Sequence, residues 1–173
     1  SVVIHTLEEI GKGWENGSVS LAQVYMSGII CEELIDQYLP KTNIQRKVIP
    51  KIAAVVLLDH HGLGKRIVTS VLRAGGFEVL DFGQGVSVDE VVRKTIDNDL
   101  DILLISTLML PSALKVKEVK SQLLQKGSSV KIIVGGAPFR MDTGLWKNVG
   151  ADADGKNASN IINIIEKYIE GGI

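Results

Sequence analysis

The sequence predicts an α/β protein with five parallel strands, preceded by a short helical segment. Residues 51–173 repeat five times a short apolar run followed by a stretch with helical periodicity. Residues 1–48 contain no strand-like run. The chain has 173 residues, 45% of them hydrophobic and 23% charged. That composition suffices for one domain of ordinary size with a packed core and a small appendage.

The N-terminal segment has the pattern of two helices. Apolar and small residues recur at helical spacing at Leu7, Ile10, Gly11 and Trp14. This pattern stops at Asn16-Gly17, and Ser20 is placed to cap a second helix that ends near Pro40. Residues 41–50 are polar and bounded by prolines, which is typical of a linker. We therefore divide the chain into residues 1–48 and residues 49–173.

Strands and helices alternate in the second part. The strands should cover residues 53–58, 77–82, 102–105, 130–134 and 151–153. The helices should cover about 65–74, 87–97, 111–125, 142–148 and 158–168. The first strand is continuously apolar, as expected for burial on both faces. Ser87 and Glu90 form a capping box at the start of the second helix.

Parallel strands joined by right-handed helical crossovers give a doubly wound sheet with helices on both faces. A unit of five such strands most often has the order 2-1-3-4-5, so we expect a flavodoxin-like (Rossmann-like) fold. Ligands of these sheets bind beyond the carboxyl ends of the strands, at the point where the strand order reverses.

Three short motifs follow the expected strands at fixed separations. The first, Asp59-His60-His61-Gly62-Leu63-Gly64, reads D-x-H-x-x-G and follows the first strand. After 41 residues, Ser106-Thr107-Leu108 reads S-x-L at the end of the third strand, and after 26 more, Gly135-Gly136 follows the fourth. Each motif alone is weak, and a Gly-Gly pair is usually a turn. Because the carboxyl ends of parallel strands meet at one edge, all three should lie in one site.

His61 is placed to bind a metal, and the carboxylate of Asp59, two residues earlier, is placed to orient its ring. A carboxylate that accepts a hydrogen bond from a histidine fixes its tautomer and makes the free nitrogen a better donor. The alternative is a structural hydrogen bond at a strand end. His60 should point elsewhere. A zinc site is not expected, because no further histidine or cysteine stands at a usable spacing.

Composition excludes several other functions. The 19 basic and 20 acidic residues balance to a net charge of −1, and the absence of a basic run argues against nucleic-acid binding. The single cysteine, Cys31, cannot form an internal disulfide and should be a buried thiol. There is no run of 18 apolar residues and no signal-peptide pattern, so we expect no membrane association and a cytoplasmic location.

Together, the three motifs resemble the signature of cobalamin-binding domains of the methionine synthase and corrinoid methyltransferase family. The resemblance covers nearly the whole chain. It implies cobalamin as the cofactor, in its methylcobalamin and cob(I)alamin states, bound base-off/His-on. His61 would then be the lower axial ligand of cobalt, with Asp59 hydrogen-bonded to its imidazole.

The resemblance also implies roles around the nucleotide tail of the cofactor. Ser106, followed by Leu108, would line the deep pocket that accepts the dimethylbenzimidazole, and Gly135 and Gly136 would flank that ring. Gly64 would allow close approach of the ligand. Simpler readings are a helix cap for Ser106 and a plain turn for the Gly-Gly pair.

Two further positions bear on the surroundings of His61. Ser112 matches the serine that completes a His–Asp–Ser relay in the family, and it also suits a helix start after Pro111. The two roles are compatible. Gly62, before Leu63, departs from the acidic residue that many members carry after the axial histidine. We expect a more flexible loop there, without loss of any ligand atom.

The N-terminal helices resemble the second half of the helical cap of corrinoid methyl carriers. Trp14 and Leu21 match the aromatic residue and the leucine that shield the upper face of the corrin. Both could instead be ordinary core residues between two helices. The full cap usually has four helices, so this one is short, truncated or completed by another chain.

The implied function is that of a methyl carrier without catalytic residues of its own. A substrate methyltransferase would deliver the methyl group, a methyl-acceptor methyltransferase would remove it to tetrahydrofolate or a thiol, and a reductive activator would serve the cofactor. Demethylation in anaerobic metabolism is the expected setting. One alternative is the cobalamin subunit of an adenosylcobalamin mutase, but such subunits lack a segment like Trp14–Leu21. Another is a cobalamin-dependent sensor, which would usually carry a DNA-binding module that this chain has no room for. The sequence does not identify the methyl donor.

Overall fold

The computed structural model of the chain describes residues 6, 9–10, 12–14, 16–38 and 50–171. Most of the expected linker, and with it the division after residue 48, lies outside these residues. No helix in the described part combines the length and the apolar character needed to cross a membrane.

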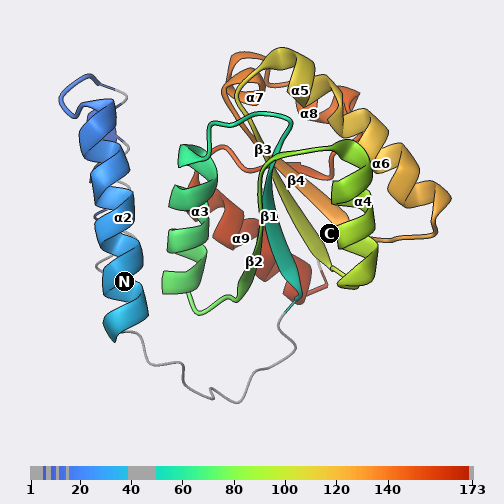
Figure 1. Cartoon of the computed structure of the whole chain (residues 1–173), viewed down its shortest axis with the longest axis horizontal. Coiled ribbons are helices and arrows are strands. Elements are labelled where there is room, and N and C mark those ends of the chain that lie inside the picture. Colours follow the sequence, from blue (N-terminus) through green and yellow to red (C-terminus); the bar gives the residue numbers. More distant parts are fainter. Residues whose placement is uncertain (1–5, 7–8, 11, 15, 39–49, 172–173) are drawn as a thin grey trace.

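Five parallel strands form one sheet in the described residues, in the order β2-β1-β3-β4-β5 (Figure 1). The strands are β1 (Ile52–Leu57), β2 (Val79–Val86), β3 (Ile102–Thr107), β4 (Lys131–Gly136) and β5 (Ala153–Asp154). The predicted fold and strand order are confirmed. β1 and β3 are central strands and are almost completely buried, because helices cover both faces of the sheet.

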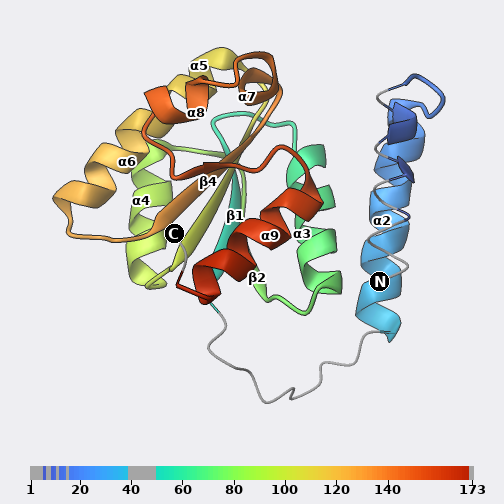
Figure 2. The same ribbon diagram turned by 180° about the vertical axis from the view of Figure 1, so that it is seen from behind.

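The helices lie in two layers, one on each face of the sheet (Figures 1 and 2). One layer contains α3 (Leu63–Ala74) and α9 (Ala158–Ile169). The other contains α4 (Val88–Asp97), α5 (Leu110–Leu114), α6 (Val116–Gln125), α7 (Ala137–Met141) and α8 (Leu145–Asn148). Each layer closes over its own apolar cluster, with Leu72 and Ile165 on the first face and Val91 and Val119 on the second. Burial of these faces stabilises the domain.

Three elements differ from the sequence prediction. β2 continues to Val86, four residues past its expected end, through two glycines with positive φ and a shifted register against β1. The expected helix 111–125 is divided at Lys115, whose N–H bonds the Ser112 carbonyl three residues back. The helix expected at 142–148 is replaced by α7 and α8, separated by a turn at Asp142 and Gly144.

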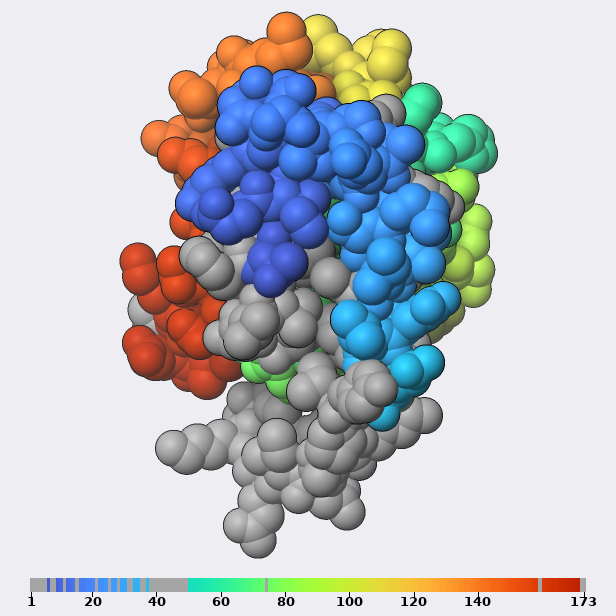
Figure 3. Space-filling view, turned by 90° about the vertical axis from the view of Figure 1, so that its left-hand side faces the viewer, coloured from blue at the N-terminus to red at the C-terminus, as the bar shows by residue number. Residues whose placement is uncertain are grey.

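The N-terminal segment is helical at residues 6, 9–10 and 12–14, turns at residues 16–17, and continues as α2 (Leu21–Tyr38). The side chains of Ser20 and Gln23 cap α2 reciprocally: Gln23 N–H donates to Ser20 Oγ, and Ser20 N–H donates to Gln23 Oε1. α2 lies beside α3, and in Figure 3 the N-terminal segment spreads across that side of the molecule. The two expected N-terminal helices thus stand next to the α/β domain.

Candidate functional site

Asp59 is the centre of a hydrogen-bonded cluster at the carboxyl edge of the sheet. It follows β1 and is only 7% exposed. Its Oδ2 accepts hydrogen bonds from the backbone N–H groups of Leu108 at 2.7 Å and Met109 at 3.1 Å. Its Oδ1 accepts one from Ser112 Oγ at 2.9 Å. The end of β1 is therefore tied to the start of α5 through one carboxylate.

Asp59 is ionised in this setting. Burial pushes the pKa of its carboxyl upward, but the hydrogen bonds from Leu108, Met109 and Ser112 outweigh burial, and the pKa lies below its usual value. The neighbouring His61 lowers it further through charge. A fixed negative charge thus stands next to an imidazole.

His61 itself is exposed. The hydrogen bonds of the Asp59 carboxylate come from Leu108, Met109 and Ser112, and none between described residues joins it to His61. The hydrogen bond from His61 to Asp59 that the sequence predicted is thus not formed between the described residues, and the two side chains are related by charge alone.

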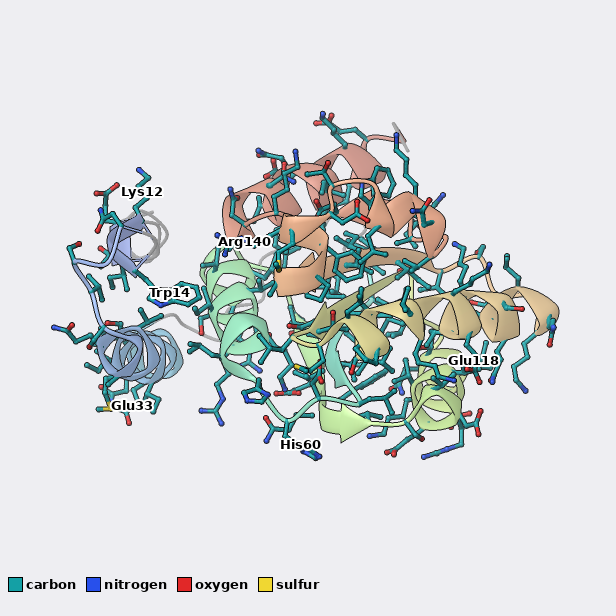
Figure 4. All side chains as sticks on the ribbon, turned by 90° about the horizontal axis from the view of Figure 1, so that it is seen from above. Lys12, Trp14, Glu33, His60, Glu118 and Arg140 are labelled. Carbon is teal, nitrogen blue, oxygen red and sulfur yellow. The ribbon has the colours of Figure 1, made fainter. Side chains whose placement is uncertain are left out.

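A cavity of about 490 Å³ opens beside this cluster, between α3, α9 and the sheet. Its floor is formed by β1, β3 and β4, and the N-terminal segment contributes Lys12 and Trp14 to its wall. Apolar side chains of α3 and α9, among them Val68 and Ile161, line its sides. Figure 4 shows Trp14 directed from the N-terminal segment toward α3. The cavity is large enough for a flat heterocyclic group.

The two glycines of β4 have different surroundings. At Gly135 a methyl group would meet nothing within 4 Å, because this Cα faces the cavity. At Gly136, φ is +118°, and a methyl group would overlap the carbonyl group of Thr107 on the neighbouring strand. Gly135 therefore keeps the cavity open, whereas Gly136 is required by the backbone. Both are the last residues of β4 and not a turn after it.

Comparison with known proteins fits this geometry. The sequence model of the family described as "B12 binding domain" matches residues 49–162. The chain is 32% identical over 162 residues to dimethylamine corrinoid protein 3 of Methanosarcina acetivorans, covering 90% of this chain and 74% of that protein.

This chain is a corrinoid protein of the B12-binding family.

Solved structures agree. The monomethylamine corrinoid protein of Methanosarcina barkeri superposes with a TM-score of 0.65 at 28% identity, over 92% of this chain and 77% of that one. The methanol:cobalamin methyltransferase complex of the same species gives a TM-score of 0.69 at 25% identity, over 98% of this chain and 65% of that one. Membership of the family identifies the cofactor of this corrinoid protein as cobalamin.

The residues of the cavity fit the nucleotide tail of cobalamin. Ser106 presents its hydroxyl to the cavity, and a methyl group on Gly64 would lie 3.5 Å from Ser106 Oγ. Any larger side chain on Gly64 would compete with a ligand for the space beside that hydroxyl. Together with the open space at Gly135, these features suit a flat ring that is hydrogen-bonded at one edge.

The residues singled out from the sequence fall into three groups. Gly64, Ser106, Gly135, Gly136 and Trp14 line the cavity. Asp59, Ser112 and the backbone of Leu108 form the carboxylate cluster, whereas the side chain of Leu108 is 41% exposed. His61, Gly62 and Leu63 lead from that cluster into α3. The side chain of Leu21 lies outside the described part of the structure.

Sequence reasoning missed the basic side chains at the cavity wall. They are Lys12, Lys65, Arg140 and Lys156. Lys65 is 7% exposed and forms an ion pair with Asp81 of β2. Lys12 is likewise in an ion pair, with Glu9. The position of Lys65 directly after Gly64 was the available signal, whereas Lys12, Arg140 and Lys156 come from segments without a motif.

Proposed function

We propose that this corrinoid protein carries a methyl group between two methyltransferases. Cobalamin, when bound, supplies the cobalt atom that holds the methyl group, and the protein binds, orients and shields it. The observation that supports this role most directly is the ionised Asp59, fixed by three hydrogen bonds beside an exposed His61. Such a carboxylate is the usual partner of a histidine that binds a metal.

His61 is the proposed lower ligand of cobalt, so that cobalamin binds base-off/His-on. The ionised carboxylate of Asp59 stands beside this imidazole and would orient it toward the metal. Ser112 holds the other Asp59 oxygen at 2.9 Å and keeps the carboxylate turned toward the loop. Asp59 and Ser112 would thus fix the orientation of the His61 side chain from below.

The cavity is the proposed site of the displaced dimethylbenzimidazole tail. The Ser106 hydroxyl would bond the free nitrogen of the ring, and Gly135 would lie against one of its faces. Gly64 leaves the approach to that hydroxyl open. With the tail held there, the lower face of the corrin is left to His61.

The proposed partners are a substrate methyltransferase, a methyl-acceptor methyltransferase and a reductive activator. Relatives and neighbours named for dimethylamine and monomethylamine favour a methylated amine as the methyl donor. The neighbour named as a methanol:cobalamin methyltransferase complex makes methanol the second donor to test.

The test is methyl transfer by the loaded protein. Protein reconstituted with cobalamin and reduced should take up a methyl group from one of the methylamines when the matching methyltransferase is added, and pass it to an acceptor when a second is added. Methanol with its own methyltransferase is the comparison donor. Stoichiometric cobalamin binding without methyl uptake from any of these donors would contradict the carrier role.

A substitution separates the axial ligand from the rest of the site. His61→Ala should leave cobalamin bound, because the tail cavity is unchanged, but should shift the visible spectrum to that of a form without imidazole coordination. His60→Phe, which keeps a ring at the neighbouring position, is the matched comparison and should keep the spectrum of the unaltered protein. If the spectrum of His61→Ala equals that of the unaltered protein, His61 is not the ligand.

A further inference from the structure

The loop that carries His61 is hydrogen-bonded to the end of β2. We call residues 58–62 the axial loop. Leu58 N–H donates to the Val86 carbonyl at 3.1 Å, and Gly85 N–H donates to the Asp59 carbonyl at 2.7 Å. The extension of β2 beyond Phe82 therefore pairs with the axial loop as a strand would.

The side chain of His60 lies against this extension. Gly85 has a φ of +69°, and a methyl group at its Cα would overlap the His60 ring, lying 2.8 Å from Nδ1 and 3.0 Å from Nε2. The imidazole thus occupies the place that any other residue at position 85 would need. Figure 4 shows His60 on the loop before α3.

A second contact runs in the opposite direction. A methyl group at Gly62 would lie 2.6 Å from Oε1 of Gln84, so the Gln84 side chain packs on the Cα of Gly62. The His60 ring of the axial loop thus packs on Gly85 of β2, and the Gln84 amide of β2 packs on Gly62 of the axial loop. His61 lies between the two contact points in the sequence.

The axial loop needs such support. Leu58 has a φ of +59°, a left-handed conformation that residues with side chains rarely adopt. Gly62, at the other end, restricts the backbone less than any other residue. A loop with a strained residue at one end, Leu58, and a flexible glycine at the other, Gly62, keeps a single conformation only when neighbouring groups hold it.

We propose that His60 is a positioning residue that locks the axial loop onto β2 and so aims His61 at the cofactor. The proposal deepens the proposed function and rests on His61 as the axial ligand. His60 acts through the shape of its ring, which packs on Gly85. The packing of Gln84 on Gly62 holds the other end of the loop. This arrangement offsets the absence of a side chain at Gly62.

The experiment compares His60→Ala with His60→Phe, which keeps a flat ring and removes both nitrogens. The first readout uses the protein without cofactor, in which amide hydrogen exchange is measured at Gly85. His60→Ala should speed this exchange about tenfold, because the Gly85–Asp59 hydrogen bond opens more often, and His60→Phe should leave it within about twofold. The second readout is the visible spectrum after cobalamin is added. His60→Ala should lower the fraction with coordinated imidazole, and His60→Phe should restore it.

The outcomes separate the proposals. Unchanged exchange and an unchanged spectrum in His60→Ala would overturn the positioning role. Loss of imidazole coordination in both variants at position 60 would also overturn it, because the nitrogens of His60 would then be the active feature. If the unaltered protein binds cobalamin without an imidazole ligand, the His-on part of the proposed function fails. The exchange at Gly85 still decides whether His60 locks the loop.

Discussion

Asp59 keeps its negative charge although it is almost fully buried, because three donors converge on it. A buried carboxylate without donors would be protonated more easily. The backbone of Leu108 and Met109 supplies two donors, and the sequence alone could not reveal them because they depend on how β3 meets α5. Ser112 supplies the third, which its spacing from the S-x-L motif did indicate.

The lowered pKa of Asp59 predicts an acid-dependent contribution to stability. A carboxyl whose folded pKa lies below its unfolded value of about 3.9 stabilises the fold above that value and ceases to do so as the pH falls through the folded pKa. Ser112→Ala should raise the pKa of Asp59, move the acid limb of unfolding to higher pH, and cost about 1 to 3 kcal/mol near neutral pH.

Urea unfolding between pH 3 and pH 7 measures this effect. Ser121→Ala, which changes an exposed serine on α6, is the matched control and should follow the unaltered protein. If the Ser112 and Ser121 variants give the same curve, Ser112 does not stabilise the Asp59 carboxylate.

At the scale of elements, the sequence predicted the strand–helix alternation well, because central strands of a parallel sheet are continuously apolar and helix starts carry capping residues. Ser87 does accept the Glu90 N–H at 3.3 Å. The end of β2 was missed because Gly83 and Gly85 are typical of a turn, and only the structure shows that their positive φ values belong to a strand with shifted register. Gly135 and Gly136 were likewise expected to follow a strand because glycine pairs are typical of turns, whereas they are the last two residues of β4.

The two glycines of β4 should respond oppositely to substitution. Gly135→Ala should change the free energy of unfolding by no more than about 1 kcal/mol, since its methyl group enters open space. Gly136→Ala should cost more than about 2 kcal/mol, since its methyl group would overlap Thr107 at an unfavourable φ. Chemical unfolding of both variants measures the difference.

A larger residue extends this comparison to the cofactor. Gly135→Leu should give a folded protein that no longer takes up cobalamin, because the side chain fills the tail cavity. Circular dichroism reports the fold, and the visible absorbance of protein separated from free cofactor reports uptake. Normal uptake by Gly135→Leu would mean that the tail binds elsewhere.

At the scale of the whole molecule, the N-terminal segment lies beside α3 and contributes Lys12 and Trp14 to the cavity wall. The division after residue 48 remains a proposal, as does the role of residues 1–48 as a partial cap. Trp14 lines the cavity and is 43% exposed, so it is not an ordinary core residue between two helices. Sequence periodicity placed Trp14 on a helix, but it could not show whether the indole points inward or toward a ligand.

Trp14→Ala should therefore affect the cofactor more than the fold. Removing a partly exposed indole should cost at most about 2 kcal/mol, much less than removal from a core. Cobalamin affinity should stay near that of the unaltered protein, because the partly exposed Trp14 forms only part of the cavity wall and Gly64, Ser106 and Gly135 are untouched. If the indole shields the upper face of the corrin, methylcobalamin bound to the variant should be photolysed or oxidised faster. Thermal unfolding and the photolysis rate of the loaded protein are measured together. A lowered melting temperature with an unchanged photolysis rate would assign Trp14 to packing alone, and a faster rate with a nearly unchanged melting temperature would support the cap.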